Sequence, residues 1–324
     1  MSALVELEQE TYTAQRFPPL SLGAAYDPQT ALATCWLSQL AYESDPAKID
    51  AVLRAWGLER EAIVGNREQA PQQLTATRGL VVRAARASII AFTGTDPLVG
   101  RNWLTDISTW SSADDMHAGF DAAARAVWPE IAARARSARV AGLPLIVTGH
   151  SLGAAIAAIA AKRIRDEGLA DVASVYTFGM PRSGGERFAR EYGEALELRT
   201  FRLVHGDDIV PAVPPAGFRV KLPQGWEFPV GIQFRHVGCL VQSGPDKSFM
   251  SSQPVWPSNE PFLLPTAISA VVNAWRTALA TGLPPAAQPG WRGRFYRTLP
   301  MAVFDHLPAG YLAGLGAVLT NEGL

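Results

Sequence analysis

One stretch of the sequence restricts the fold more than any other. It runs from Leu143 to Ala161 and reads LPLIVTGHSLGAAIAAIAA. Its first part is apolar and β-branched, which predicts a buried strand over 145–148. Its last part is rich in Ala, which predicts a helix over 152–167 that packs closely on its neighbours. Only a Gly-His-Ser-Leu-Gly pentapeptide separates the two, so the chain must turn sharply from strand to helix, with Ser151 at the corner.

Gly149 and Gly153 stand two positions before and after Ser151, and His150 precedes it. At such a corner, side chains at the two flanking positions would collide, so both positions favour Gly. The corner holds the Ser hydroxyl clear of the sheet, at the start of a helix whose amides, beginning with Leu152, can face a developing negative charge. A pentapeptide of this kind can arise by chance, but its place between a predicted strand and a predicted helix favours a nucleophile.

Further strands and helices are predicted along the whole chain. Predicted strands cover residues 79–83, 87–93, 145–148, 172–178, 198–204 and 232–241. Predicted helices cover residues 29–42, 47–56, 121–138, 152–167, 186–192 and 266–281. Asp27-Pro28 and Asp45-Pro46 predict capped starts for the first two helices. Strands that alternate with helices predict an α/β fold, a single domain over 1–324 in which helices cover both faces of a mostly parallel sheet.

Composition excludes several classes of protein. Hydrophobic residues make up 48% of the 324, enough for a large core, and a net charge of −1 gives no reason to expect a nucleic-acid partner. The only cysteines, Cys35 and Cys239, form neither a disulfide framework nor a cysteine-based zinc site. Residues 1–17 carry three Glu where a signal peptide needs an apolar run, and no segment has the length and apolarity of a transmembrane helix. Localisation stays open between cytoplasm, non-classical export and a mature secreted form.

A nucleophilic Ser needs a general base and an acid that orients the base. Hydrolases with a Ser at a strand-to-helix corner carry Ser, acid and His in that chain order. Asp207 and Asp208 compete for the acid, in a loop after the predicted strand that ends at Val204. His236 and His306 follow this loop. His236 lies in a strand-like run that favours a packed side chain, whereas His306 lies in a loop before a short predicted helix, a better place for a base.

Several motifs together resemble the class 3 (fungal-type) lipase family of the α/β-hydrolase superfamily, with a start that is similar to its bacterial members. The blocks that carry the resemblance appear in the family's order and read WLSQLAYESD (36–45), AFTGTD (91–96), RNWLTDI (101–107), HAGF (117–120), LIVTGHSLGAA (145–155), YTFGMPRSGGERFA (176–189), DIVPAVPP (208–215), RHVG (235–238) and DHLPAGYL (305–312).

The resemblance implies an α/β-hydrolase fold and a role for each block. It assigns Asp208 as the acid and His306 as the base, because RHVG is a block whose His is not the base. It also implies an oxyanion hole formed by the amides of Thr95 and Leu152. Thr93 is a departure, since the family usually has Arg at this position, and whatever that Arg braces must be braced differently here.

Two segments stay open in function. Residues 97–116 resemble the lid of the family, in which the apolar Trp103, Leu104 and Ile107 alternate with polar residues and can close over the acyl site. The alternative is a rigid segment with Trp103 permanently buried. Residues 242–301 are rich in Pro and aromatic side chains and predict either a cap over the acyl site or a surface insertion.

The expected activity is hydrolysis of a lipid ester, as in a triacylglycerol lipase, by Ser151, His306 and Asp208, with no metal and no cofactor. Phospholipase A1 and feruloyl-type esterase are the alternatives within this chemistry, and an inactive hydrolase fold used as a binding scaffold is the alternative outside it. The expected partner is the ester substrate. A transient contact with a lipid surface is conceivable through the WRGRFYR run (291–297), and no obligate protein partner is predicted.

Overall fold

Strands and helices alternate along most of the chain. The structure is a computed structural model that describes residues 5–65, 77–94, 115–214, 216, 218–221, 227–230, 234–256, 274, 277 and 299–319. The strands are β1 (Glu59–Val64), β2 (Gly79–Arg83), β3 (Ser88–Phe92), β4 (Leu145–His150), β5 (Val172–Phe178), β6 (Thr200–Val204), β7 (Phe218–Lys221), β8 (Glu227–Val230) and β9 (Cys239–Gln242). The helices are α1 (Gln9–Thr13), α2 (Pro28–Leu40), α3 (Pro46–Ala55), α5 (Ala118–Val140), α6 (Leu152–Asp166), α7 (Glu186–Leu196), α10 (Met301–Phe304) and α11 (Pro308–Gly314), with 3₁₀ turns η1 (Glu197–Arg199) and η2 (Val210–Ala212).

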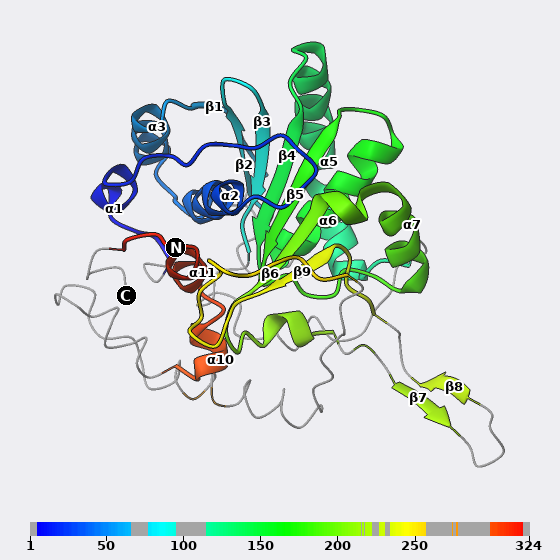
Figure 1. The fold of residues 1–324 in the computed structure, drawn as a ribbon. Helices are drawn as coiled ribbons and strands as arrows, with labels where there is room; N and C mark the ends of the chain where they lie inside the picture. The colour runs from blue at the N-terminus through cyan, green and yellow to red at the C-terminus, as the bar shows by residue number, and fades with distance from the viewer. Residues whose placement is uncertain are drawn as a thin grey trace.

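The central sheet of the described chain has the strand order β1-β2-β3-β4-β5-β6-β9. The first three strands pair antiparallel, and every neighbouring pair from β3 to β9 is parallel. The expected α/β-hydrolase type of fold, with a mostly parallel sheet, is therefore confirmed. β7 and β8 pair with each other in a separate hairpin, which extends away from the sheet in Figure 1.

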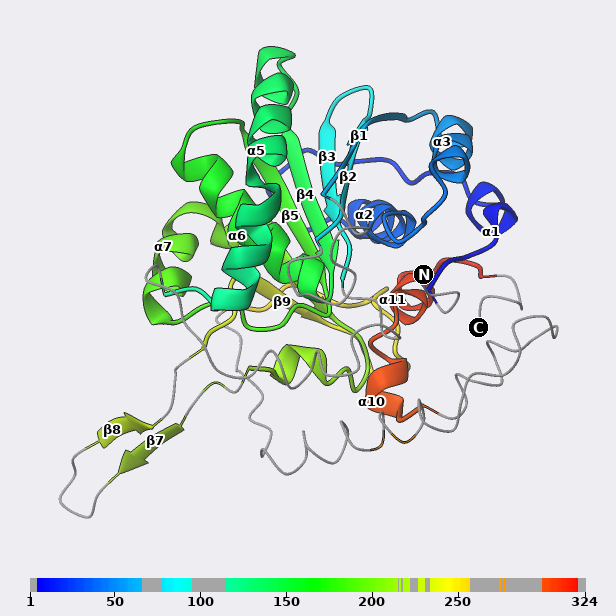
Figure 2. The ribbon, with the colours of Figure 1, turned by 180° about the vertical axis from the view of Figure 1, so that it is seen from behind.

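Helices cover both faces of this sheet. Figure 1 shows α2 and α11 on one face, and the reverse view in Figure 2 shows α5, α6 and α7 on the other. Alternate residues of a strand point to opposite faces, so one strand contributes to two cores. Ile89 and Ile146 join the core that contains Trp36 of α2, whereas Ile90 and Val147 join the core under α5 and α6.

The expected starts of the first two long helices are confirmed. The Asp27 carboxylate accepts the Thr30 N–H over 2.7 Å, and the Asp45 carboxylate accepts the Ala47 N–H over 2.8 Å. Each cap is followed by Pro, which lacks the N–H that a first turn leaves without a partner. No helix in the described ranges has the length and apolarity needed to cross a membrane.

The strand predicted over 232–241 is wrong in extent, because β9 comprises only Cys239–Gln242. Gly238 has a φ of 82°, which takes the preceding residues out of the sheet. Just before it, the His236 side chain turns to the carbonyl of Pro211 over 2.8 Å. The sequence analysis also missed β1, a half-exposed edge strand with three charged residues at its start. The helix predicted over 266–281 lies almost wholly outside the described residues.

The carboxyl ends of the parallel strands meet at one edge of the sheet. Loops that follow β3, β4, β5 and β6 all begin there, as does the segment after β9. In doubly covered sheets such an edge is where binding and catalytic side chains gather. The described candidate residues of the sequence analysis lie in these loops or, for His306, between α10 and α11.

Candidate active site

Ser151 occupies the sharp corner between β4 and α6. Its backbone φ of 59° lies in the positive range that a residue with a side chain rarely adopts. The Ser151 N–H donates to the carbonyl of Phe178, the last residue of β5, over 2.9 Å. A Cβ on Gly149 would lie 2.3 Å from the Gly153 carbonyl oxygen, and a Cβ on Gly153 would lie 2.4 Å from the Thr93 carbonyl oxygen. The expectation that both flanking positions need Gly is confirmed.

The structure brings Ser151, His306 and Asp208 together from three separate loops. His306 Nε2 lies 2.8 Å from Ser151 Oγ, and His306 Nδ1 lies 2.9 Å from Asp208 Oδ2. All three side chains are buried. Because a carboxylate only accepts, Nδ1 carries the proton of the neutral ring, and Nε2 is left to accept from the Ser hydroxyl. The arrangement can therefore draw the proton from a Ser that would otherwise be a weak nucleophile.

Asp208 is held by more than the histidine. Tyr311, on α11, donates its hydroxyl to Asp208 Oδ2 over 2.6 Å, and the Val210 N–H donates to Oδ1 over 2.9 Å. Burial and the neighbouring Asp208 charge raise the pKa of Tyr311 well above its ordinary value, so the phenol keeps its proton and remains a donor. Tyr311 was not among the predicted site residues. Its signal was a Tyr five positions after His306, on the short predicted helix.

His150 connects the two sides of the site. Burial, together with the His306 charge, lowers the pKa of His150 well below its ordinary value, so its ring stays neutral. The hydroxyl of Tyr42 accepts the Gly94 N–H over 2.8 Å and lies 2.8 Å from His150 Nδ1. His150 Nε2 lies 2.7 Å from the His306 carbonyl oxygen, which can only accept. The proton of His150 is thus on Nε2, and a directed chain runs from Gly94 through Tyr42 and His150 to the His306 backbone.

Comparison with known proteins shows a similarity to one family. A family model described as Lipase (class 3) matches residues 89–218, the segment that contains the Ser151 corner and the Asp208 loop. This segment of the chain is therefore similar to class 3 lipases. Solved lipases with the same fold include the lipase from Rhizopus microsporus var. chinensis, with a TM-score of 0.54 and 21% identity over 78% of this chain and 87% of that one. Lipase LIP2 of Yarrowia lipolytica is similar, with a TM-score of 0.55 and 17% identity over 74% and 88%.

Curated relatives are similar to the chain over shorter segments. A secreted mono- and diacylglycerol lipase of Fusarium solani is 35% identical over 39% of this chain and 40% of its own length. A triacylglycerol lipase of Ricinus communis is 31% identical over 52% of this chain and 32% of its own length. A phospholipase A1 of Oryza sativa subsp. indica is 30% identical over 43% and 42%. The chain thus spans less than half the length of each of these relatives.

The other described candidates have different surroundings. Asp207 is exposed, whereas Asp208 is buried beside His306. His236 Nε2 lies 2.8 Å from the Pro211 carbonyl. Burial, followed by the charges of two nearby arginines, lowers the pKa of His236 well below its ordinary value. Its neutral ring therefore supports the loop that follows Asp208, as a packed side chain would.

Several predicted residues lie outside the described ranges. They are the oxyanion residue Thr95, the lid residues Trp103, Leu104 and Ile107, and most of the 97–116 and 242–301 segments. The described end of the proposed oxyanion segment, Gly94, lies beside Ser151, since a Cβ there would be 2.6 Å from Ser151 Cβ. Leu152 begins α6, and the amides of a first helical turn have no acceptor within the helix.

Thr93 marks the departure from the family motif. Its N–H and its hydroxyl both reach the carbonyl of Arg78, at 3.0 and 3.3 Å. The buried Thr93 is thereby tied to the start of the neighbouring strand β2, immediately before the oxyanion segment. Within the part of the chain that the structure describes, no group of three or more His, Cys, Asp or Glu side chains is arranged to hold a metal ion.

Proposed function

We propose that this chain is a serine carboxylic-ester hydrolase that acts on lipid esters, with acylglycerols as the substrate class. The observation that carries the proposal is the unbroken line of hydrogen bonds from Ser151 through His306 to Asp208, at 2.8 and 2.9 Å. A protein that only binds has no need for a strained Ser aligned with a His and a buried acid. The names of the Fusarium and Ricinus relatives support acylglycerols as the substrate.

The proposed reaction is acyl transfer to water in two halves. His306 Nε2 takes the proton of Ser151 Oγ as the oxygen attacks the ester carbonyl carbon, and the amides of Leu152 and Thr95 receive the oxyanion. His306 then gives the proton to the leaving alcohol, and an acyl-enzyme remains. In the second half, His306 takes a proton from water, the hydroxide attacks the acyl carbon, and Ser151 leaves with its proton restored. Asp208 keeps the imidazole in one tautomer throughout and stabilises its charged form.

Phospholipase A1 activity is the second candidate, and the similarity to the Oryza phospholipase supports it. Both activities use the same acyl transfer and differ in the group that leaves with the alcohol oxygen. A feruloyl-type esterase would instead favour a rigid aromatic acyl group. The three substrate classes therefore differ in acyl and alcohol parts and can be separated by turnover alone.

The test is a substrate panel with the purified chain and its Ser151→Ala variant. The panel contains p-nitrophenyl esters from short to long acyl chains, emulsified trioleoylglycerol, phosphatidylcholine vesicles and methyl ferulate. We expect long-chain p-nitrophenyl esters and trioleoylglycerol to be hydrolysed by the parent and not by Ser151→Ala. Release of the sn-1 fatty acid from phosphatidylcholine alone would move the assignment to phospholipase A1. Turnover of methyl ferulate alone would move it to an aryl esterase, and no turnover of any ester would refute the proposal.

A further inference from the structure

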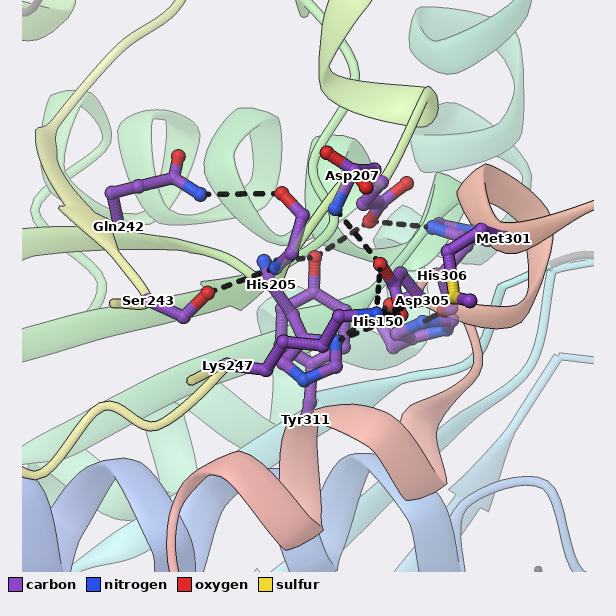
Figure 3. Close-up of polar contacts among 12 residues, drawn as sticks. His150, His205, Asp207, Gln242, Ser243, Lys247, Met301, Asp305, His306 and Tyr311 are labelled. Atoms are coloured by element: carbon purple, nitrogen blue, oxygen red, sulfur yellow. Dashed lines mark hydrogen bonds and ion pairs between the residues drawn. The ribbon is translucent and has the colours of Figure 1, made fainter. Parts of the chain in front are cut away.

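An ion pair between a buried carboxylate and a partly exposed lysine lies immediately beside the proposed base. Asp305 precedes His306 in the chain and is fully buried. Lys247, from the segment after β9, places its Nζ 2.7 Å from Asp305 Oδ1 and 2.9 Å from Oδ2, as Figure 3 shows. The proposed mechanism gives neither residue a task. Burying a carboxylate costs free energy, and this one also places a negative charge next to the proposed base. Its presence there therefore calls for an explanation.

The Asp305 carboxylate faces the loop that carries Asp208. The Asp207 N–H donates to Asp305 Oδ2 over 2.9 Å. A Cβ at Gly206 would lie 2.3 Å from the same oxygen, so the loop can approach this closely only because Gly stands there. The Asp305 carbonyl oxygen lies 3.2 Å from His205 Nδ1 at the start of the loop. Asp305 thus contacts the Asp208 loop through both its side chain and its backbone.

The segment that supplies Lys247 also holds the Asp208 loop from its other side. The Gly206 N–H donates to Ser243 Oγ over 2.8 Å, and Gln242 Nε2 lies 3.4 Å from the Gly206 carbonyl oxygen (Figure 3). Lys247 has a φ of 61°, a positive value that a residue with a side chain adopts only where its surroundings require it. The end of β9, the Asp208 loop and the His306 loop therefore meet at the Asp305 carboxylate.

The charged and titratable groups around Asp305 fall into two sets. Lys247 supplies a cation, and the His205 ring, whose pKa is lowered by burial, is a neutral donor. Asp208, His306 and Tyr311 are hydrogen-bonded to one another in the line of the site. An ion pair with a buried carboxylate contributes little to stability overall because of the cost of desolvating that charge, but it can fix geometry. Here the geometry that it fixes is the position of one reactive loop against another.

We propose that Asp305, paired with Lys247, is a positioning residue that holds the His306 loop against the Asp208 loop. It does not touch the substrate, and it acts through the alignment of His306 with Asp208 and Ser151. The inference rests on the proposed ester hydrolysis, since it assigns a role within that reaction. A misplacement of the base by a fraction of an ångström lowers the rate of the chemical step while substrate binding changes little.

The test separates the rate per working site from the number of working sites. A p-nitrophenyl phosphonate that reacts with Ser151 counts the sites, and p-nitrophenyl butyrate gives kcat per counted site and KM. We expect Asp305→Ala to lower kcat per site by about tenfold or more, with KM within about threefold of the parent. Lys247→Met should lower it by about threefold to tenfold, and Lys247→Arg should recover most of the loss. The double variant Asp305→Asn/Lys247→Met should be no worse than the poorer single one, because the pair acts as a unit.

Lys48→Met is the matched control. Lys48 pairs with the buried Glu43 at 2.6 Å, a similar ion pair that contacts neither reactive loop. The Lys48→Met variant should have lower thermal stability and an unchanged kcat per counted site. An Asp305→Ala variant with fewer counted sites but an unchanged kcat per site would overturn the proposal, since Asp305 would then serve folding alone. If Asp305→Ala yields no folded protein, an unchanged kcat per site in both Asp305→Asn and Lys247→Met overturns it equally. A parent enzyme that neither reacts with the phosphonate nor hydrolyses the ester would instead refute the proposed function.

Discussion

The proposed nucleophile and the proposed base are held in two different ways. Ser151 sits on a corner between β4 and α6, and its position follows from a handful of consecutive residues. His306 sits in a short connection between α10 and α11, and its position depends on contacts from distant parts of the chain. His150 contacts the backbone carbonyl of His306. Asp305, the residue before His306, accepts a hydrogen bond from the Asp208 loop. One half of the machinery is thus encoded locally and the other half by long-range packing.

The largest expected effect tests whether the two halves act as one. Ser151→Ala, His306→Ala and Asp208→Asn should each lower kcat by about 10⁴-fold or more, because each removes a group that the acyl transfer needs. The double variant Ser151→Ala/His306→Ala should be no slower than either single variant. Steady-state rates on p-nitrophenyl butyrate provide the measurement. Near-normal turnover by His306→Ala would mean that another base serves Ser151, and His236→Ala is the variant to compare.

The second prediction concerns the corner that holds Ser151. Gly153→Ala would place a Cβ 2.4 Å from the Thr93 carbonyl oxygen and 2.5 Å from that of Phe92. Backbone atoms cannot move aside cheaply, so we expect a loss of about 3 kcal/mol in the free energy of unfolding, measured in urea. Gly23→Ala is the control, because its Cβ would meet only a Ser hydroxyl at 3.6 Å. Equal stability of the two variants would show that the corner has more room than its geometry indicates.

The third prediction concerns the long-range contacts that hold Asp208 and leaves the corner at Ser151 unchanged. Tyr311→Phe removes the hydroxyl that donates to Asp208 Oδ2 over 2.6 Å. A hydrogen bond to a charged group is worth about 2 kcal/mol, so kcat should fall by about thirtyfold if the bond matters most in the transition state. KM for a soluble ester should change little. A full kcat in Tyr311→Phe would show that His306 and the Val210 N–H hold Asp208 in place without the phenol.

The features that could be predicted from the sequence divide in the same way. The corner, its two Gly residues, the capped helix starts and the α/β order all depend on neighbours in the chain, and all could be predicted from it. Asp208 and His306 emerged only through the resemblance to a family, since the residues alone left Asp207 and His236 as competitors. Tyr42, Tyr311, Lys247 and Asp305 escaped prediction, because nothing in their surrounding sequence shows which distant loop they contact. The strand predicted over 232–241 failed for a similar reason, since His236 is turned to Pro211 by tertiary packing.

The smallest expected effect concerns pH and uses a histidine that serves neither half directly. Burial lowers the pKa of His236, so the folded chain keeps this ring neutral while the unfolded chain binds a proton near pH 6.5. The unfolded state therefore gains protons as pH falls, and stability is lost below about pH 6.5. Between pH 7.5 and 5.5, His236→Gln should lose up to about 1.4 kcal/mol less than the parent. Urea unfolding at the two pH values measures the difference, and parallel losses in the two proteins would contradict the assignment of a buried neutral ring.

The gathering of the described reactive loops at one edge of the sheet leaves the opposite edge free for other uses. The turn between α5 and β4 lies there, at the top of Figure 1. Val140 at this turn is 90% exposed, and a Cβ on Gly142 would have nothing within 4 Å. Exposed turns of this kind tolerate insertions and attachments well. A linker fixed at this turn would anchor the protein to a bead or an electrode with the proposed active site directed outward, toward an oil droplet or a dissolved ester that would test the proposed activity.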